Sequence, residues 1–160
     1  MRRTTVLVAA GGVALAALWF LVSIPFGAGA TQHPPGSLLR GQDPEVVALG
    51  AEIYDAECAA CHGTELEGQP DWRRALPNGR LPAPPHDATG HTWHHPDEVL
   101  VAITTLGTEA VVGGGYKSDM PGFGDRLSAD EIVAVLSYIK STWPAEVIAI
   151  HDDVNARAAE

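Results

Sequence analysis

Positive charge is scarce in this sequence. Its 160 residues include 10 lysines and arginines against 20 acidic residues, and two of the basic ones, Arg2 and Arg3, precede Ala30. The chain beyond Ala30 therefore holds eight basic and 20 acidic residues, a formal charge of −12. Such a surface repels phosphate groups, which excludes nucleic acid and anionic lipid and favours a protein partner with a basic docking face. Solubility alone is the competing explanation of this acidity.

Internal repeats and strand-like patterns are also absent, and the length suits one domain with appendages. Apolar residues recur every three or four positions before Cys58, after Pro96 and after Ser128, as in amphipathic helices. Gly50 is costly in the first of these helices unless another element approaches it closely, and Tyr138 on the last one is the candidate ring. The sequence therefore predicts an all-α domain.

The only two cysteines stand together in Cys58-Ala59-Ala60-Cys61-His62. This spacing is the attachment signal of a c-type haem: both thiols add to the vinyl groups and the histidine binds the iron. One helical turn brings the three side chains to the same macrocycle. A thioredoxin-like disulfide is the alternative, but no βαβ pattern precedes the motif and His62 would have no role. A single motif implies one covalent haem c and disfavours di-haem peroxidases.

The longest uncharged run lies near the N-terminus. Val6 to Phe26 gives 21 residues without a charge, enough for a helix across roughly 30 Å of hydrocarbon. Arg2 and Arg3 are then expected in the cytoplasm, which sends the rest of the chain into the periplasm. Ala28-Gly29-Ala30 resembles a signal-peptidase site, so cleavage after Ala30 is the alternative. Because the run exceeds the roughly 7 to 15 apolar residues of a normal signal core, we favour a retained inner-membrane anchor.

Four segments follow from these patterns. Residues 1–26 are the membrane anchor or an uncleaved signal, and the glycine- and proline-rich residues 27–43 are a flexible tether. Residues 44–144 are the haem domain, and residues 145–160 are a C-terminal tail helix. Within the haem domain, residues 63–91 are rich in proline and glycine with little periodicity, as in an ordered loop that wraps a ligand.

This loop contains three arginines, Arg73, Arg74 and Arg80. They are candidates for neutralising haem propionates or for a docking patch, although a solvated loop face explains them as well. Its prolines lack N–H groups, so a carbonyl among them is a candidate acceptor for the Nδ1 proton of His62, which would fix the tautomer of that ligand.

His62 leaves one axial position of the iron for a second donor. Met1 belongs to the cytoplasmic end, so a sulfur donor must be Met120, within the glycine-rich run 113–123. A thioether raises the reduction potential and closes the iron to small ligands, as in an electron carrier.

Other side chains compete for the iron or contact the haem. Four histidines, namely His86, His91, His94 and His95, are alternatives to Met120 or candidates for a separate copper or zinc site. Trp93 is a candidate donor to a propionate or a core residue, and Tyr116 in the run 113–123 is a further candidate haem contact.

Taken together, these motifs resemble the class I cytochromes c over about Pro44 to Pro144. The resemblance rests on the Cys58 to His62 motif, on Met120-Pro121-Gly122-Phe123 and on the paired helices of Gly50 and Tyr138. Small membrane-anchored mono-haem cytochromes c of proteobacteria are the most similar. The resemblance implies a cytochrome c fold, ligation by His62 and Met120, and a proline carbonyl, that of Pro84, which orients His62. His86 departs from the leucine that the family usually has two residues after this proline.

The sequence thus predicts a non-catalytic one-electron carrier of a periplasmic respiratory chain, with a haem that alternates between ferric and ferrous states. Expected partners are a quinol-oxidising complex or dehydrogenase as donor and a terminal oxidase or reductase as acceptor. Two alternatives remain open: a haem subunit of a larger oxidase or reductase, and a sensor or enzyme with a displaceable sixth ligand.

Overall fold

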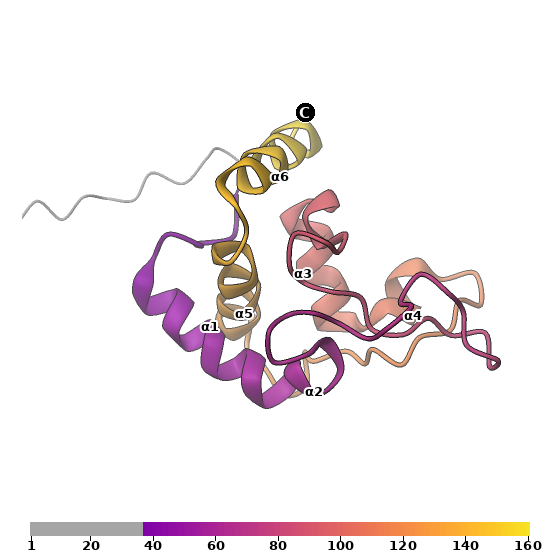
Figure 1. Ribbon diagram of the computed structural model, residues 1–160. Helices are drawn as coiled ribbons and strands as arrows, with labels where there is room; N and C mark the ends of the chain where they lie inside the picture. Colours follow the sequence, from indigo (N-terminus) through magenta and orange to yellow (C-terminus); the bar gives the residue numbers. More distant parts are fainter. Residues whose placement is uncertain (1–36) are drawn as a thin grey trace, which may run out of the picture. The chain divides into compact units, whose positions relative to one another are not determined.

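The structure, a computed structural model, describes residues 37–160, and this part of the chain contains helices and no strand. In chain order (Figure 1) the helices are α1 (Pro44–Glu57), α2 (Ala59–His62), the 3₁₀ helix η1 (Thr92–His94), α3 (Asp97–Leu106), α4 (Thr108–Val112), α5 (Ala129–Ser141) and α6 (Ala145–Ala158). The all-α prediction is confirmed for these residues. The expected anchor, residues 1–26, lies outside them. Among the described helices, none combines the length and apolar character that crossing a bilayer requires.

The two longest helices of the predicted haem domain both begin with a side-chain cap. At α1, Oδ1 of Asp43 accepts from the backbone N–H groups of Glu45 (3.1 Å) and Val46 (3.3 Å), with proline at the first helical position. At α5, Ser128 and Glu131 form a capping box, in which each side chain accepts from the other's backbone N–H. These caps satisfy N–H groups that the helices themselves leave without a partner.

Helix α1 packs directly on α5 at Gly50. A Cβ atom added to Gly50 would lie 2.0 Å from the carbonyl oxygen of Ala134 and 2.8 Å from Cβ of Tyr138. The Tyr138 ring lies 5.5 Å from the ring of Tyr54, one turn further along α1. The close approach expected from Gly50 and Tyr138 is therefore present. Apolar side chains of both helices fill the core here, including the buried Ile53, Tyr54, Ile132, Val135, Leu136 and Ile139.

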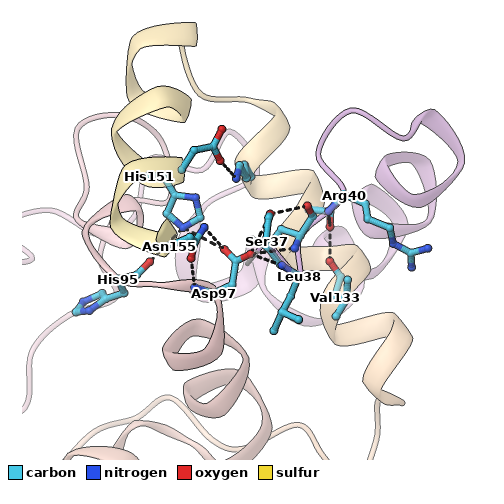
Figure 2. A network of polar contacts seen from close by, with 12 residues as sticks. Ser37, Leu38, Arg40, His95, Asp97, Val133, His151 and Asn155 are labelled. Atoms are coloured by element: carbon cyan, nitrogen blue, oxygen red, sulfur yellow. Dashed lines mark hydrogen bonds and ion pairs between the residues drawn. The ribbon is translucent and has the colours of Figure 1, made fainter. Parts of the chain in front are cut away.

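A buried carboxylate ties the start of the described chain to α3 and α6 (Figure 2). Asp97 has no exposed surface, and its Oδ2 accepts from the N–H groups of Leu38 (2.7 Å) and Leu39 (3.0 Å) and from the Ser37 hydroxyl (3.2 Å). Asn155 on α6 donates to Oδ1 of Asp97 at 3.0 Å and accepts from its backbone N–H at 2.7 Å. We call Asp97, Asn155 and His151 the Asp97 network.

His151 completes this network from α6. Its side chain is fully buried, and Nε2 lies 3.3 Å from Oδ1 of Asp97 and 3.1 Å from the His95 carbonyl oxygen. Burial is the main cause that lowers the pKa of His151, and Lys140 lowers it further against the opposing charges of Asp97 and Asp152.

Two segments differ from the sequence expectation. Residues 37–43, expected as the end of a flexible tether, pack on the domain through the Asp97 network and through Leu39, which is only 2% exposed. Helix α4 follows Gly107, whose φ of 86° suits glycine, and the sequence does not predict it. The predicted tail helix is present as α6 and starts directly after Pro144.

Candidate haem site

The attachment motif occupies the junction of α1 and α2. Cys58 ends α1, and its carbonyl accepts from the N–H groups of Cys61 (3.1 Å) and His62 (2.9 Å), so one helical turn holds all three side chains. Both thiols are free, Cys61 on the surface and Cys58 half-buried. Burial, helped by Glu57, raises the pKa of Cys58 to about 11, so this group stays a neutral thiol at pH 7.

His62 is buried, and a single contact defines its protonation pattern. Its Nδ1 lies 2.8 Å from the carbonyl oxygen of Pro84, as the family resemblance implies. A carbonyl only accepts, so the proton is on Nδ1 and the lone pair of Nε2 is free for a metal. Burial lowers the pKa of His62 and the Pro84 contact opposes it, which leaves the neutral imidazole that iron requires. The free thiols and this lone pair fit a covalent haem.

The loop 63–91 folds back on the motif to place Pro84. The N–H of Gly68 donates to the His62 carbonyl at 2.7 Å, and the N–H of Gln69 donates to Ala83 at 2.9 Å. A Cβ atom on Gly68 would lie 2.4 Å from the nitrogen of Pro85, so a larger residue would displace the proline segment. The loop therefore holds the acceptor of the His62 proton in position.

His86 lies directly against the predicted iron ligand. The His86 and His62 rings are stacked, with centroids 3.8 Å apart and planes 17° from parallel. Burial lowers the pKa of His86 well below its usual range, so its imidazole is neutral. The position where the family usually has leucine thus carries a flat neutral ring.

Met120 lies half-buried in the segment between α4 and α5, and the residues after it are bound to the end of α3. Phe123 donates its N–H to Thr104 at 2.9 Å, and Gly124 donates to Thr105 at 3.0 Å. A Cβ atom on Gly122 would lie 2.7 Å from the Leu106 carbonyl carbon, so the two backbones touch. These contacts give the Met120 segment a defined position, beside an open hollow of about 350 Å³ that Met120 helps to line.

One ion pair joins the loop of Pro84 to the segment of Met120. Arg80 and Asp119 pair across these loops, next to the predicted sulfur donor. Both side chains are at least 36% exposed, so solvent screens the pair and its net contribution to stability is roughly 0–1 kcal/mol.

The remaining candidates have partners of their own. The Trp93 indole N–H donates to the Ala88 carbonyl at 3.3 Å, and its ring stacks on His94. Tyr116 is half-buried, and its backbone N–H bonds to Gly113. Haem contacts of Trp93 and Tyr116 remain predictions.

Two of the remaining histidines, His91 and His95, contact each other. His91 stacks on Trp72, over which Arg73 also lies, and His95 meets His91 edge to face. Within residues 37–160 no group of three or more histidine, cysteine or acidic side chains is arranged to hold a second metal ion. Arg74, the remaining loop arginine, lies on the surface near Trp72.

Sequence reasoning missed two residues that support the His62–His86 stack. Trp143, which follows the C-cap of α5, donates its indole N–H to the His86 carbonyl at 2.7 Å. Tyr54 meets the His86 ring edge to face, with centroids 5.8 Å apart. No local pattern marks these contacts, because 57 residues separate Trp143 from His86.

A helical domain with one Cys-x-x-Cys-His turn and a metal-ready imidazole defines a c-type cytochrome. The family model described as Cytochrome c matches residues 47–143, more than half of the chain. The chain therefore belongs to the class I cytochrome c family and carries covalent haem c, and Cys58 and Cys61 have the spacing of the attachment motif.

The chain is similar to two characterised cytochromes. The gluconate 2-dehydrogenase cytochrome c subunit of Pantoea cypripedii is 30% identical over 108 residues, which is 67% of this chain but 22% of that protein. The cytochrome c6 of Leptolyngbya boryana is 33% identical over 92 residues, 58% of this chain and 87% of that protein. The chain thus spans about a fifth of the first relative's length. No solved structure matches this chain.

Proposed function

We propose that this cytochrome is a one-electron carrier whose iron is bound by His62 and Met120. The haem would supply reversible one-electron chemistry, and the residues around it determine whether a substrate or a gas molecule can also bind the iron. The observation that carries the proposal is the binding of the Met120 segment to α3, through Phe123 and Gly124. A sulfur donor held in this way is expected to stay on the iron, which excludes substrate and gas binding.

The absorption spectrum of the purified holoprotein tests this ligation. We expect the weak long-wavelength sulfur-to-iron charge-transfer band in the oxidised form and no binding of carbon monoxide to the reduced form. Met120→Ala should abolish the band. Ser118→Ala is the matched control, because it removes only the hydroxyl that accepts from the Met120 N–H at 3.1 Å.

Two results would contradict the proposal. A low-spin spectrum without the band would assign the sixth ligand to a histidine. A high-spin spectrum with ready binding of carbon monoxide would make the protein a sensor or an enzyme.

We further propose that the carrier is tethered to the inner membrane with its haem domain in the periplasm. Support comes from the uncharged run Val6 to Phe26 behind Arg2 and Arg3. Cell fractionation with intact-mass measurement tests this: the full chain plus haem should be found in the membrane fraction. A soluble protein whose mass corresponds to a start at Thr31 would refute the anchor.

The proposed partners are redox proteins with basic docking faces, a quinol-oxidising complex or dehydrogenase on one side and a terminal oxidase or reductase on the other. The charge of −12 beyond Ala30 supports this choice. Association driven by such charge weakens as salt shortens the Debye length, to roughly 8 Å at 0.15 M. A rate of electron exchange that does not fall between low and high salt would contradict charge-driven docking.

A second candidate is a haem subunit of a larger dehydrogenase, oxidase or reductase. The similarity to a gluconate 2-dehydrogenase cytochrome c subunit favours it. Purification in mild detergent followed by native mass measurement separates the two. A stable stoichiometric complex with a catalytic subunit would favour the second candidate, and a free cytochrome would favour the carrier.

A further inference from the structure

We propose that His86 is a positioning residue that fixes the plane of the His62 imidazole. Two contacts restrain His62, and they act in different directions. The Pro84 carbonyl at 2.8 Å lies at the ring edge and restrains Nδ1, but one bond of this kind resists tilting of the ring only weakly. The His86 ring, 3.8 Å away and 17° from parallel, lies against the ring face and blocks that tilt.

His86 is itself held by the helical core. Its N–H donates to Leu66 at 2.8 Å, and its carbonyl accepts from Trp143 at 2.7 Å. The edge-to-face contact with Tyr54 of α1 restrains the ring on a further side. These contacts of His86 therefore relate the plane of the His62 ring to α1 and to the end of α5. The two helices cross at Gly50.

A buried nitrogen of His86 indicates that this side chain was not selected for the stability of the fold. Its Nδ1 is buried without a hydrogen-bond partner in the described part of the chain. An apolar side chain would avoid the cost of burying this nitrogen. A flat ring, in contrast to a branched aliphatic chain, covers the whole face of its neighbour. The site therefore gains orientation of its iron ligand from a residue that folding alone does not favour.

This inference rests on the proposed function insofar as His62 binds the iron. Support for an iron ligand by its neighbours is a recognised means of tuning a haem protein, since the ligand plane determines how the unpaired electron of ferric iron is distributed. That distribution is visible in the hyperfine-shifted proton resonances of the haem methyl groups and in the electron paramagnetic resonance g-values. Neither readout depends on a redox partner.

Three variants of the full-length holoprotein form the test. His86→Phe keeps a ring against His62, and His86→Leu removes it in favour of the residue usual in the family. Asp153→Leu is the control, a change to leucine at an exposed position of α6 whose carboxylate pairs with Arg157. We expect the leucine variant at 86 to change the methyl-shift pattern and the g-values, whereas the phenylalanine variant and the Asp153 control keep those of the wild type. Both variants at 86 should unfold at the wild-type temperature or above it, because the partnerless nitrogen is gone.

The outcomes separate the alternatives. If His86→Leu leaves the shifts and g-values unchanged, or if His86→Phe changes them as much, stacking does not set the ligand plane. The charge-transfer band that depends on Met120 is recorded in every variant, so a failure of the proposed ligation is seen independently.

A variant that does not fold leaves the wild-type measurement decisive. Nuclear Overhauser contacts between the ring protons of His62 and His86 in the reduced, diamagnetic wild type report the angle between the two rings directly. A plane close to parallel with the His86 ring supports the inference, and one close to perpendicular overturns it.

Discussion

Replacement of Asp97 by asparagine is expected to destabilise the domain strongly without opening a cavity. The carboxylate accepts from two sides, Leu38 and Leu39 at Oδ2 and Asn155 at Oδ1. An amide of the same shape has only one acceptor oxygen, so in either orientation its NH₂ group faces donors. Each buried group left without a partner costs about 1–3 kcal/mol, and with two such groups we expect a loss of about 2–6 kcal/mol.

Thermal unfolding of the full-length holoprotein measures this loss. For a domain of this size about 1 kcal/mol corresponds to about 4 °C, so Asp97→Asn should lower the midpoint by about 8–24 °C. Hydrogen exchange should also become faster in the peptide that contains Leu38 and Leu39. The matched control is Asp153→Asn on α6, which breaks an exposed pair with Arg157 and should cost less than about 0.5 kcal/mol.

An Asp97→Asn variant that unfolds at the same temperature as the Asp153→Asn control, and that keeps the protection of Leu38 and Leu39, would contradict this prediction. That result would mean that the buried carboxylate adds nothing beyond shape.

Further predictions concern helix packing, pH and the surface ion pair. Gly50→Ala should lower stability by about 1–3 kcal/mol in chemical unfolding, because its Cβ would overlap the Ala134 carbonyl; wild-type stability would contradict the tight crossing. The pKa of His151 is lowered in the folded state, so the unfolded chain takes up the proton first as pH falls below about 6.5. Stability should therefore fall between pH 7 and 5 by up to about 1.4 kcal/mol per pH unit from this group, and His151→Gln should flatten that part of the profile. An unchanged slope would exclude His151 as its source. Arg80→Gln should change the unfolding free energy by less than about 1 kcal/mol, since both partners are partly solvated; a larger loss would show a structural role for the pair.

Local patterns predict the parts of this fold that depend on neighbours in the sequence. The helix starts at Asp43 and Ser128 and the attachment turn at Cys58 are set by contacts within a few residues. Gly50 is predictable for a different reason, because a glycine inside an amphipathic helix is costly unless something approaches it.

The rest depends on contacts that no short window contains. Asp97 meets its partners across 58 to 60 residues in both directions, and its place in the first turn of α3 gives it an ordinary helix-start role. The departure at His86 is visible in the sequence, but its stacking on His62 is not, because the loop 63–91 must first fold back on the motif.

The length of helix α1 separates the attachment of the N-terminal segment from the haem motif. Its 14 residues, at about 1.5 Å each, separate the Asp43 end from the Cys58 end by about 21 Å. Leu38 and Leu39 are fastened to α3 and α6 at the first end, while the redox chemistry takes place at the second. A force that reaches the domain through Ser37 would load the Asp97 network before it strained His62 or its supports. Tension on the chain would therefore act on the Asp97 network and leave the position of His62 and its supporting residues unchanged.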